Sequence, residues 1–204
     1  MNYLRIFLIL FLFSLVSGCE DEPIKQSLNK SLLIPLKIGN EWTYIDSSVN
    51  AEGTHAFVET KTYVIIKDSI WNEEKMFMFN RTDFLDINLY GYFLNRADGT
   101  YLFDSSNIAN EPQMFIKFPV YKNNGFKGYT DFLIVSNIDT SYTTPAGLFN
   151  CIMYESIKSD KNNSYYIHYF SPGIGHIASE YYYKNIGEDY YLVRTVILTS
   201  YKFK

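Results

Sequence analysis

The sequence predicts an all-β protein with a single, strongly curved antiparallel sheet, a half-barrel or barrel-like shape, after an N-terminal signal segment. Aromatic residues make up 18% of the chain and include 19 Tyr, and they lie in runs typical of strands rather than at helical spacing. Turn signals divide these runs into about 10–11 strands. Because a flat sheet of that size would curl or split, we expect strong curvature.

Alternation of polarity and turn residues mark the expected strands along the chain. Residues 57–67 alternate in polarity, which predicts a half-buried antiparallel strand. Asp98-Gly99 lies between residues 88–95 and 100–103 and predicts a tight hairpin. Pro119 marks the end of a strand or places that strand at a sheet edge. The folded part opens at 36–44, where Gly39-Asn40 indicates a turn and Trp42 and Tyr44 then share a face. The remaining expected strands are 75–79, 113–120, 131–138, 147–158, 164–170, 175–183 and 189–202, with a turn at 68–74 and loops at 121–130 and 139–146.

The N-terminus has the layout of a secretory signal. Arg5 is the only charge in residues 1–18, and an apolar run extends from Ile6 to Val16. That run is too short to cross a hydrocarbon core of about 30 Å, which needs about 20 helical residues. The segment therefore predicts targeting rather than a membrane span.

Leu15-Val16-Ser17-Gly18-Cys19 ends this segment and resembles the bacterial lipobox. The resemblance implies cleavage between Gly18 and Cys19 and acylation of Cys19, with palmitate as a typical chain. Two or more acyl chains anchor a protein stably, so no further membrane-binding surface is required. The alternative is an ordinary signal peptide that precedes a free cysteine.

The sequence divides into a signal peptide (1–18), a lipidated cysteine with a flexible acidic tether (19–32) and one β domain (33–204). Acidic residues 20–22 resemble the export signal of Bacteroidota surface lipoproteins, although tethers are often charged anyway. We therefore expect an outer-membrane lipoprotein of the cell envelope, on either the periplasmic face or the cell surface.

Charge and cysteine content exclude several classes of protein. The formal net charge is −4 at pH 7 and no cluster of Lys or Arg is visible, which argues against binding of nucleic acid. If Cys19 is lipidated, only Cys151 remains, so no intramolecular disulfide can form. Cys151 lies in an apolar run and is expected to be a small buried residue.

Three stretches resemble the pattern of uncharacterised Bacteroidota envelope lipoproteins. They are LKIGNEWTY (36–44), TPAGLFNC (144–151) and YFSPGIG (169–175). The resemblance implies a curved antiparallel half-barrel and carries no activity with it. Locally, Thr144-Pro145 favours extended backbone at Thr144, and Gly147 and Gly173 permit positive φ.

Motifs for catalysis and cofactor binding are absent from the sequence. His168 and His176 flank the Pro172-Gly173 turn, so strand pairing could bring them together, but no further ligand lies at metal-binding spacing. We therefore predict no metal, no cofactor and no catalytic residue. Carboxylates from distant strands could still form the pair of an envelope hydrolase.

Tyrosine clusters provide the only candidate binding residues. Tyr165, Tyr181, Tyr183 and Tyr191 could line a groove for an apolar or glycan ligand, since Tyr combines an apolar face with a hydroxyl. Alternatively, they cover the sheet. The first function considered is a non-enzymatic binding or carrier lipoprotein, and the alternative is a structural or assembly subunit of an envelope protein complex.

Overall fold

The computed structural model describes residues 32–50, 54–80, 91–104, 111–157, 163–185 and 189–204. These residues form twelve β-strands, and no helix is present among them. None of them belongs to a helix long and apolar enough to cross a membrane. The strands are β1 (Glu41–Val49), β2 (His55–Trp71), β3 (Glu74–Phe79), β4 (Gly91–Arg96), β5 (Gly99–Asp104), β6 (Gln113–Lys117), β7 (Gly125–Lys127), β8 (Phe132–Thr144), β9 (Gly147–Ser156), β10 (Ser164–Ser171), β11 (Gly175–Tyr183) and β12 (Tyr191–Lys202).

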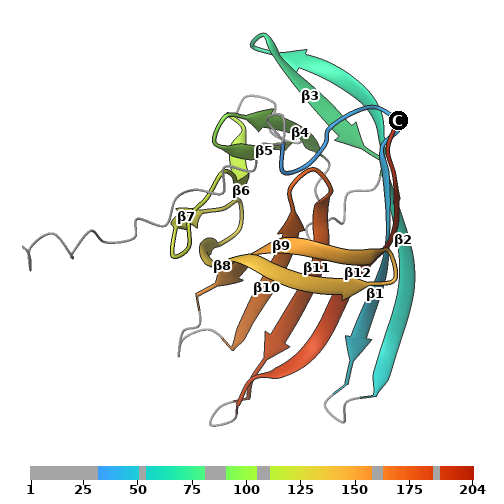
Figure 1. Cartoon of the computed structure of the whole chain (residues 1–204), viewed down its shortest axis with the longest axis vertical. Coiled ribbons are helices and arrows are strands. Elements are labelled where there is room, and N and C mark those ends of the chain that lie inside the picture. The colour runs from blue at the N-terminus through green and yellow to red at the C-terminus, as the bar shows by residue number, and fades with distance from the viewer. Residues whose placement is uncertain (1–31, 51–53, 81–90, 105–110, 158–162, 186–188) are drawn as a thin grey trace, which may run out of the picture.

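All twelve strands belong to one antiparallel sheet, which confirms the predicted fold class. Its order is β6-β5-β4-β3-β2-β1-β12-β11-β10-β9-β8-β7, so every neighbour is sequential except the pair β1 and β12. The sheet curls strongly, and the hairpins from β3 to β6 bend over one end of it (Figure 1). Side chains join edge strand β6 to the far side, where Tyr154 on β9 donates a hydrogen bond to the Lys117 carbonyl at 2.9 Å.

Three predicted boundaries are wrong. The expected loop at 121–130 contains β7, which pairs with β8, and this strand brings the observed number to twelve. The expected turn at 68–74 is shorter, because β2 runs to Trp71 and only Asn72 and Glu73 adopt positive φ, 45° and 67°. The expected loop at 139–146 is mostly strand, since β8 reaches Thr144. In each case pairing with a neighbouring strand satisfies the backbone despite a turn-like composition.

The predictions made from proline and glycine agree better with the structure. β6 ends at Lys117, before Pro119, and is an edge strand of the sheet, as Pro119 indicated. Gly147 has φ 136° and Gly173 has φ 80°, both in the region that favours glycine. These positions shape the β8–β9 and β10–β11 turns.

The main core lies on the concave side of the sheet. Its largest fully buried side chains include Trp42, Tyr44, Tyr154 and Phe170. Burying a large side chain contributes about 1.5–3 kcal/mol, but a buried polar group must find a partner. The Trp42 indole donates to the Ile174 carbonyl at 2.8 Å, and the Tyr44 hydroxyl donates to the His176 carbonyl at 3.0 Å. Both bonds tie β1 to the β10–β11 hairpin.

The two ends of the described domain lie at the same end of the sheet. Leu33 and Ile34 are buried, and the Gly173 amide donates to the Leu32 carbonyl at 2.9 Å. The backbone amide of Lys204 donates to the side-chain oxygen of Asn40 at 3.0 Å. The chain therefore enters and leaves the fold close to the core that it builds.

Candidate functional site

A cavity of about 240 Å³ opens on the concave side of the sheet. Its walls come from β6, β8, β10, β11 and the segment between β7 and β8. The lining residues are Phe115, Ile116, Gly128, Tyr129, Thr130, Asp131, Leu133, Tyr166, His168, Phe170 and Tyr181. Aromatic rings make up most of the wall, and Asp131 is the one residue in this lining that carries a charge at neutral pH.

Strand alternation explains why aromatic and polar side chains meet here. Tyr166, His168 and Phe170 are every second residue of β10 and therefore share one face. On β11, Tyr181 pairs with Tyr166 and Ser179 pairs with His168. Directly paired residues point to the same side of a sheet, so these side chains converge on the concave surface.

His168, which lines the cavity, is joined through one serine to a second histidine, and neither the serine nor the second histidine is part of the lining. His168 Nδ1 lies 2.7 Å from Ser179 Oγ, and His176 Nε2 lies 2.6 Å from the same oxygen. Burial lowers the pKa of His168 to about 3. Burial also lowers the pKa of His176, and the nearby His168 ring lowers it further. Both imidazoles are therefore neutral at pH 7. The sequence correctly indicated that the two rings could be close, and their centroids are 6.2 Å apart.

The mouth of the cavity carries a tyrosine–carboxylate pair. The Tyr166 hydroxyl donates to Asp131 Oδ2 at 2.5 Å. Burial raises the pKa of Tyr166, and the nearby Asp131 carboxylate raises it further, so the phenol keeps its proton. Asp131 itself is exposed, which leaves its carboxylate accessible from solvent.

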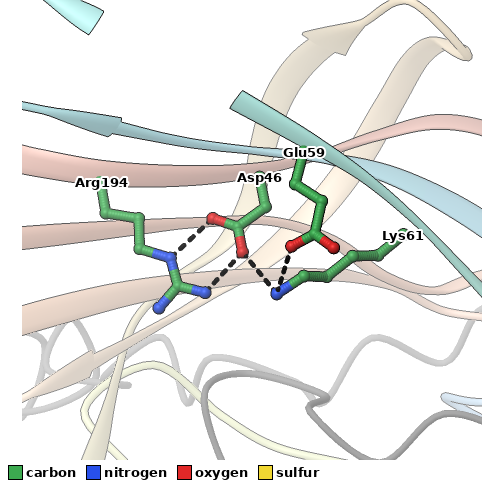
Figure 2. A network of polar contacts seen from close by, with 4 residues as sticks. All are labelled: Asp46, Glu59, Lys61 and Arg194. Carbon is green, nitrogen blue, oxygen red and sulfur yellow. Dashed lines mark hydrogen bonds and ion pairs between the residues drawn. The ribbon is translucent and has the colours of Figure 1, made fainter. Parts of the chain in front are cut away.

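A cluster of four charged side chains lies next to the cavity on the same concave face. Figure 2 shows Asp46 between Arg194 and Lys61, with Glu59 beside Lys61. Arg194 donates to both Asp46 oxygens at 2.6 Å, and Lys61 donates to Oδ2 at 2.9 Å. Burial alone would raise the pKa of Asp46, but these hydrogen bonds and charges outweigh it and lower the pKa.

The charged cluster and the cavity share one side chain. The Arg194 guanidinium lies over the Tyr181 ring, 5.4 Å from its centroid, while Tyr181 lines the cavity. Register accounts for this contact, since Arg194 on β12 pairs with Tyr181 on β11. The Tyr181 hydroxyl is buried and has no hydrogen-bond partner among the described residues.

The four tyrosines proposed from the sequence do not converge. Of these, only Tyr181 lines the cavity. Tyr165 lies on the opposite face of β10 from Tyr166 and stacks on Tyr182 with centroids 4.6 Å apart. Tyr183 and Tyr191 pair with each other nearer the strand ends, with centroids 6.2 Å apart. Gly18 and Cys19 lie outside the described residues.

The residues that sequence reasoning missed come from separate segments. Asp131 and Thr130 precede β8, Phe115 belongs to β6, and Ser179 is one of many serines. The only local signal was the alternation of Tyr166, His168 and Phe170. Among the described residues no group of three or more His, Cys, Asp or Glu could hold a metal ion. Cys151 is buried, as expected, and burial raises the pKa of its thiol to about 12.

Comparison with known proteins gives two distant structural likenesses. A "putative exported protein with YmcC-like fold" from Bacteroides fragilis is 15% identical, with a TM-score of 0.47, over 85% of this chain and 100% of the other. A "putative lipoprotein" from Parabacteroides distasonis is 16% identical, with a TM-score of 0.44, over 84% and 99%. The chain matches no protein-family model and no curated protein. Likenesses this distant carry no argument about the function of this chain.

Proposed function

We propose that this protein is a lipoprotein of the bacterial cell envelope whose β domain binds a small apolar or glycan ligand in the concave cavity. The lipobox-like sequence that ends at Cys19 supports the anchor. The observation that carries the binding role is the cavity itself. Aromatic walls with a few convergent polar groups are the usual composition of a small-molecule site.

The proposed role is non-enzymatic. The arrangement of His168, Ser179 and His176 resembles a serine nucleophile beside its base, but Ser179 is 0% exposed. A buried hydroxyl that already lies between two imidazoles cannot reach a substrate carbonyl. The network serves instead to hold the neutral His168 ring in place in the cavity wall.

The anchor is tested by replacing Cys19 with Ser in the full chain. We expect the wild-type protein to incorporate radiolabelled palmitate and to fractionate with the outer membrane. The Cys19→Ser variant should incorporate none and should leave the membrane fraction, because the acyl chains supply the membrane affinity. A variant that stays membrane-bound would refute the proposed anchor.

The binding role is tested with the intact lipoprotein purified from membranes. We expect native mass spectrometry to show a bound small molecule, and we expect Thr130→Trp to release it. Thr130 is exposed at the cavity mouth, so a bulky ring there should close the entrance while leaving the core intact. If neither the purified protein nor protein incubated with soluble ligands carries a molecule that this variant displaces, the proposed binding site is refuted.

A further inference from the structure

We propose that the ligand of the cavity is an uncharged ring that bears several hydroxyl groups, as in a sugar, and that the Asp131 carboxylate accepts its hydrogen bonds. This inference rests on the proposed binding function and narrows its two ligand classes to one. Three properties of the described cavity support it: its unpaired polar groups, its charge and its size.

Unpaired polar groups in the cavity wall argue against a purely apolar ligand. The His168 ring is hydrogen-bonded to Ser179 through Nδ1 alone. Its other nitrogen, Nε2, has no hydrogen bond from the described residues. Asp131 is exposed at the cavity mouth and has lone pairs beyond the one that accepts the bond from Tyr166. A hydrocarbon in the cavity would cover these groups without satisfying them, which is costly, whereas hydroxyls can both donate and accept.

The charge of the cavity lining argues against an anionic ligand, and the contacts of Tyr181 leave little aromatic surface for a cation. Asp131 is the one lining residue with a charge at pH 7, because His168 is neutral, and it would repel an anion. The ring of Tyr181, one aromatic surface on which a cation could stack, already carries the Arg194 guanidinium. Arg194 and Lys61 are in turn balanced by Asp46 and Glu59, so this cluster supplies no net charge that needs a counter-ion.

The size and walls of the cavity favour a single ring. Ligand pockets for drug-sized molecules usually exceed about 300 Å³. At about 240 Å³ this cavity has room for one ring of sugar size but not for a long acyl chain. Phe115, Tyr129 and Phe170 provide apolar faces, and the C–H side of a sugar ring packs well against such faces.

The test is saturation-transfer NMR on the intact lipoprotein in a detergent without a sugar headgroup. The probes are the methyl glycosides of glucose, galactose, mannose and N-acetylglucosamine, with benzene as the apolar probe and tetramethylammonium as the cationic one. We expect at least one glycoside to bind and to be displaced in Thr130→Trp. Asp131→Asn should weaken its binding about tenfold, since a hydrogen bond to a charged acceptor is lost.

The protein offers a matched control pair for these substitutions. Tyr166→Phe should also weaken binding, because its hydroxyl orients Asp131. At the β4–β5 turn, away from the cavity lining, the Tyr101 hydroxyl donates to Asp98 Oδ2 at 2.8 Å. Asp98→Asn and Tyr101→Phe remove the same two groups from this surface pair and should leave glycoside binding unchanged.

Each outcome has a distinct meaning. Binding of benzene alone, with displacement by Thr130→Trp, would overturn the sugar inference and leave the proposed binding function standing. Preference for tetramethylammonium would overturn the inference in the same way. Glycoside binding that Asp131→Asn does not weaken would refute the role of Asp131. Binding of no glycoside would overturn the sugar inference, while the binding function would then stand or fall by the native mass spectrometry described above.

Discussion

Two arginine–carboxylate pairs in this protein have nearly the same chemistry in different surroundings. Arg194 clamps Asp46 with two hydrogen bonds and lies over Tyr181. Arg96 clamps Glu74 with two hydrogen bonds, of 2.8 and 2.5 Å, and lies over Tyr101, 4.6 Å from the ring centroid. The side chains of the first pair are 3% and 18% exposed, and those of the second are 34% and 31% exposed.

The comparison shows that burial, rather than contact geometry, decides what such a pair contributes. Water screens the Glu74–Arg96 pair and solvates either partner when the other is absent. The Asp46 carboxylate has lost nearly all its water, so its free energy depends on Arg194 and Lys61. Removing one member of the buried group leaves uncompensated charge in the core, which costs far more than the pair itself contributes.

The largest effect should come from Asp46→Ala. This change leaves the Arg194 and Lys61 charges buried without the carboxylate that lies between them (Figure 2). We expect the free energy of unfolding to fall by about 3–5 kcal/mol. Chemical denaturation measures this directly. A loss below about 1 kcal/mol would show that water reaches the cluster as freely as it reaches the exposed pair.

The next effect concerns pH and the neutral histidines beside the cluster. The unfolded chain binds protons at His168 near its ordinary pKa of about 6.5, whereas the folded chain does not until about pH 3. Burial of the neutral His168 ring therefore lowers the free energy of unfolding little above about pH 6.5, and it lowers it progressively as the pH falls below that value. Between pH 7 and pH 5 we expect His168 to cost about 2 kcal/mol, and His176 to add a loss in the same direction.

Urea denaturation at pH 7 and pH 5 measures this loss, and His168→Gln should remove its share of the pH dependence. Asp46 contributes in a separate window. Its pKa is lowered, so its stabilising contribution is present above about pH 4 and is lost as the pH falls through the folded pKa. Stability that stays constant from pH 7 to pH 5 would contradict the buried, neutral state of both histidines.

A smaller effect is expected for Glu74→Ala in the exposed pair. The free energy of unfolding should fall by about 1 kcal/mol or less, because water replaces the lost carboxylate. The difference should shrink further when denaturation is repeated at about 1 M salt, where screening is nearly complete. A loss as large as that of Asp46→Ala would invalidate the comparison between the two pairs.

The smallest effect is expected for Tyr181→Phe. Because the Tyr181 hydroxyl has no hydrogen-bond partner among the residues that the structure describes, its removal should change the free energy of unfolding by less than about 0.5 kcal/mol or increase it slightly. Tyr44→Phe is the matched control, since it removes a bond to the His176 carbonyl and should cost about 1 kcal/mol. Thermal unfolding of both variants at pH 7 distinguishes the two tyrosines.

The fold was largely predictable from sequence because strand alternation and turn residues are local signals. Residues 57–67 do form a strand, but alternation does not reveal which face is buried. The buried face holds Lys61, Tyr63 and Ile65, while Val58 and Ile66 on the other face are 58% and 45% exposed. Polarity alone would place Lys61 on the exposed face. It is buried because Asp46, on another strand, neutralises its charge.

The candidate site was less predictable because its members meet only through long-range pairing. The proximity of His168 and His176 followed from the turn between them. Asp131 and Phe115 reach the cavity through the positions of separate strands, which no local pattern encodes. Tyrosine content indicated aromatic surfaces but could not separate Tyr181, which lines the cavity, from Tyr165 on the opposite face.

The pairing of β1 with β12 also sets an order of events during folding. β1 finds β2 within a few residues, but its other neighbour, residues 191–202, is the last strand of the sheet to be made. Contacts between such distant segments form slowly. Until they form, β1 presents an open edge that can associate with other chains. The ion pair between Asp46 and Arg194 is also absent at that stage. A chain that ends before residue 191 should therefore aggregate rather than settle into a smaller sheet.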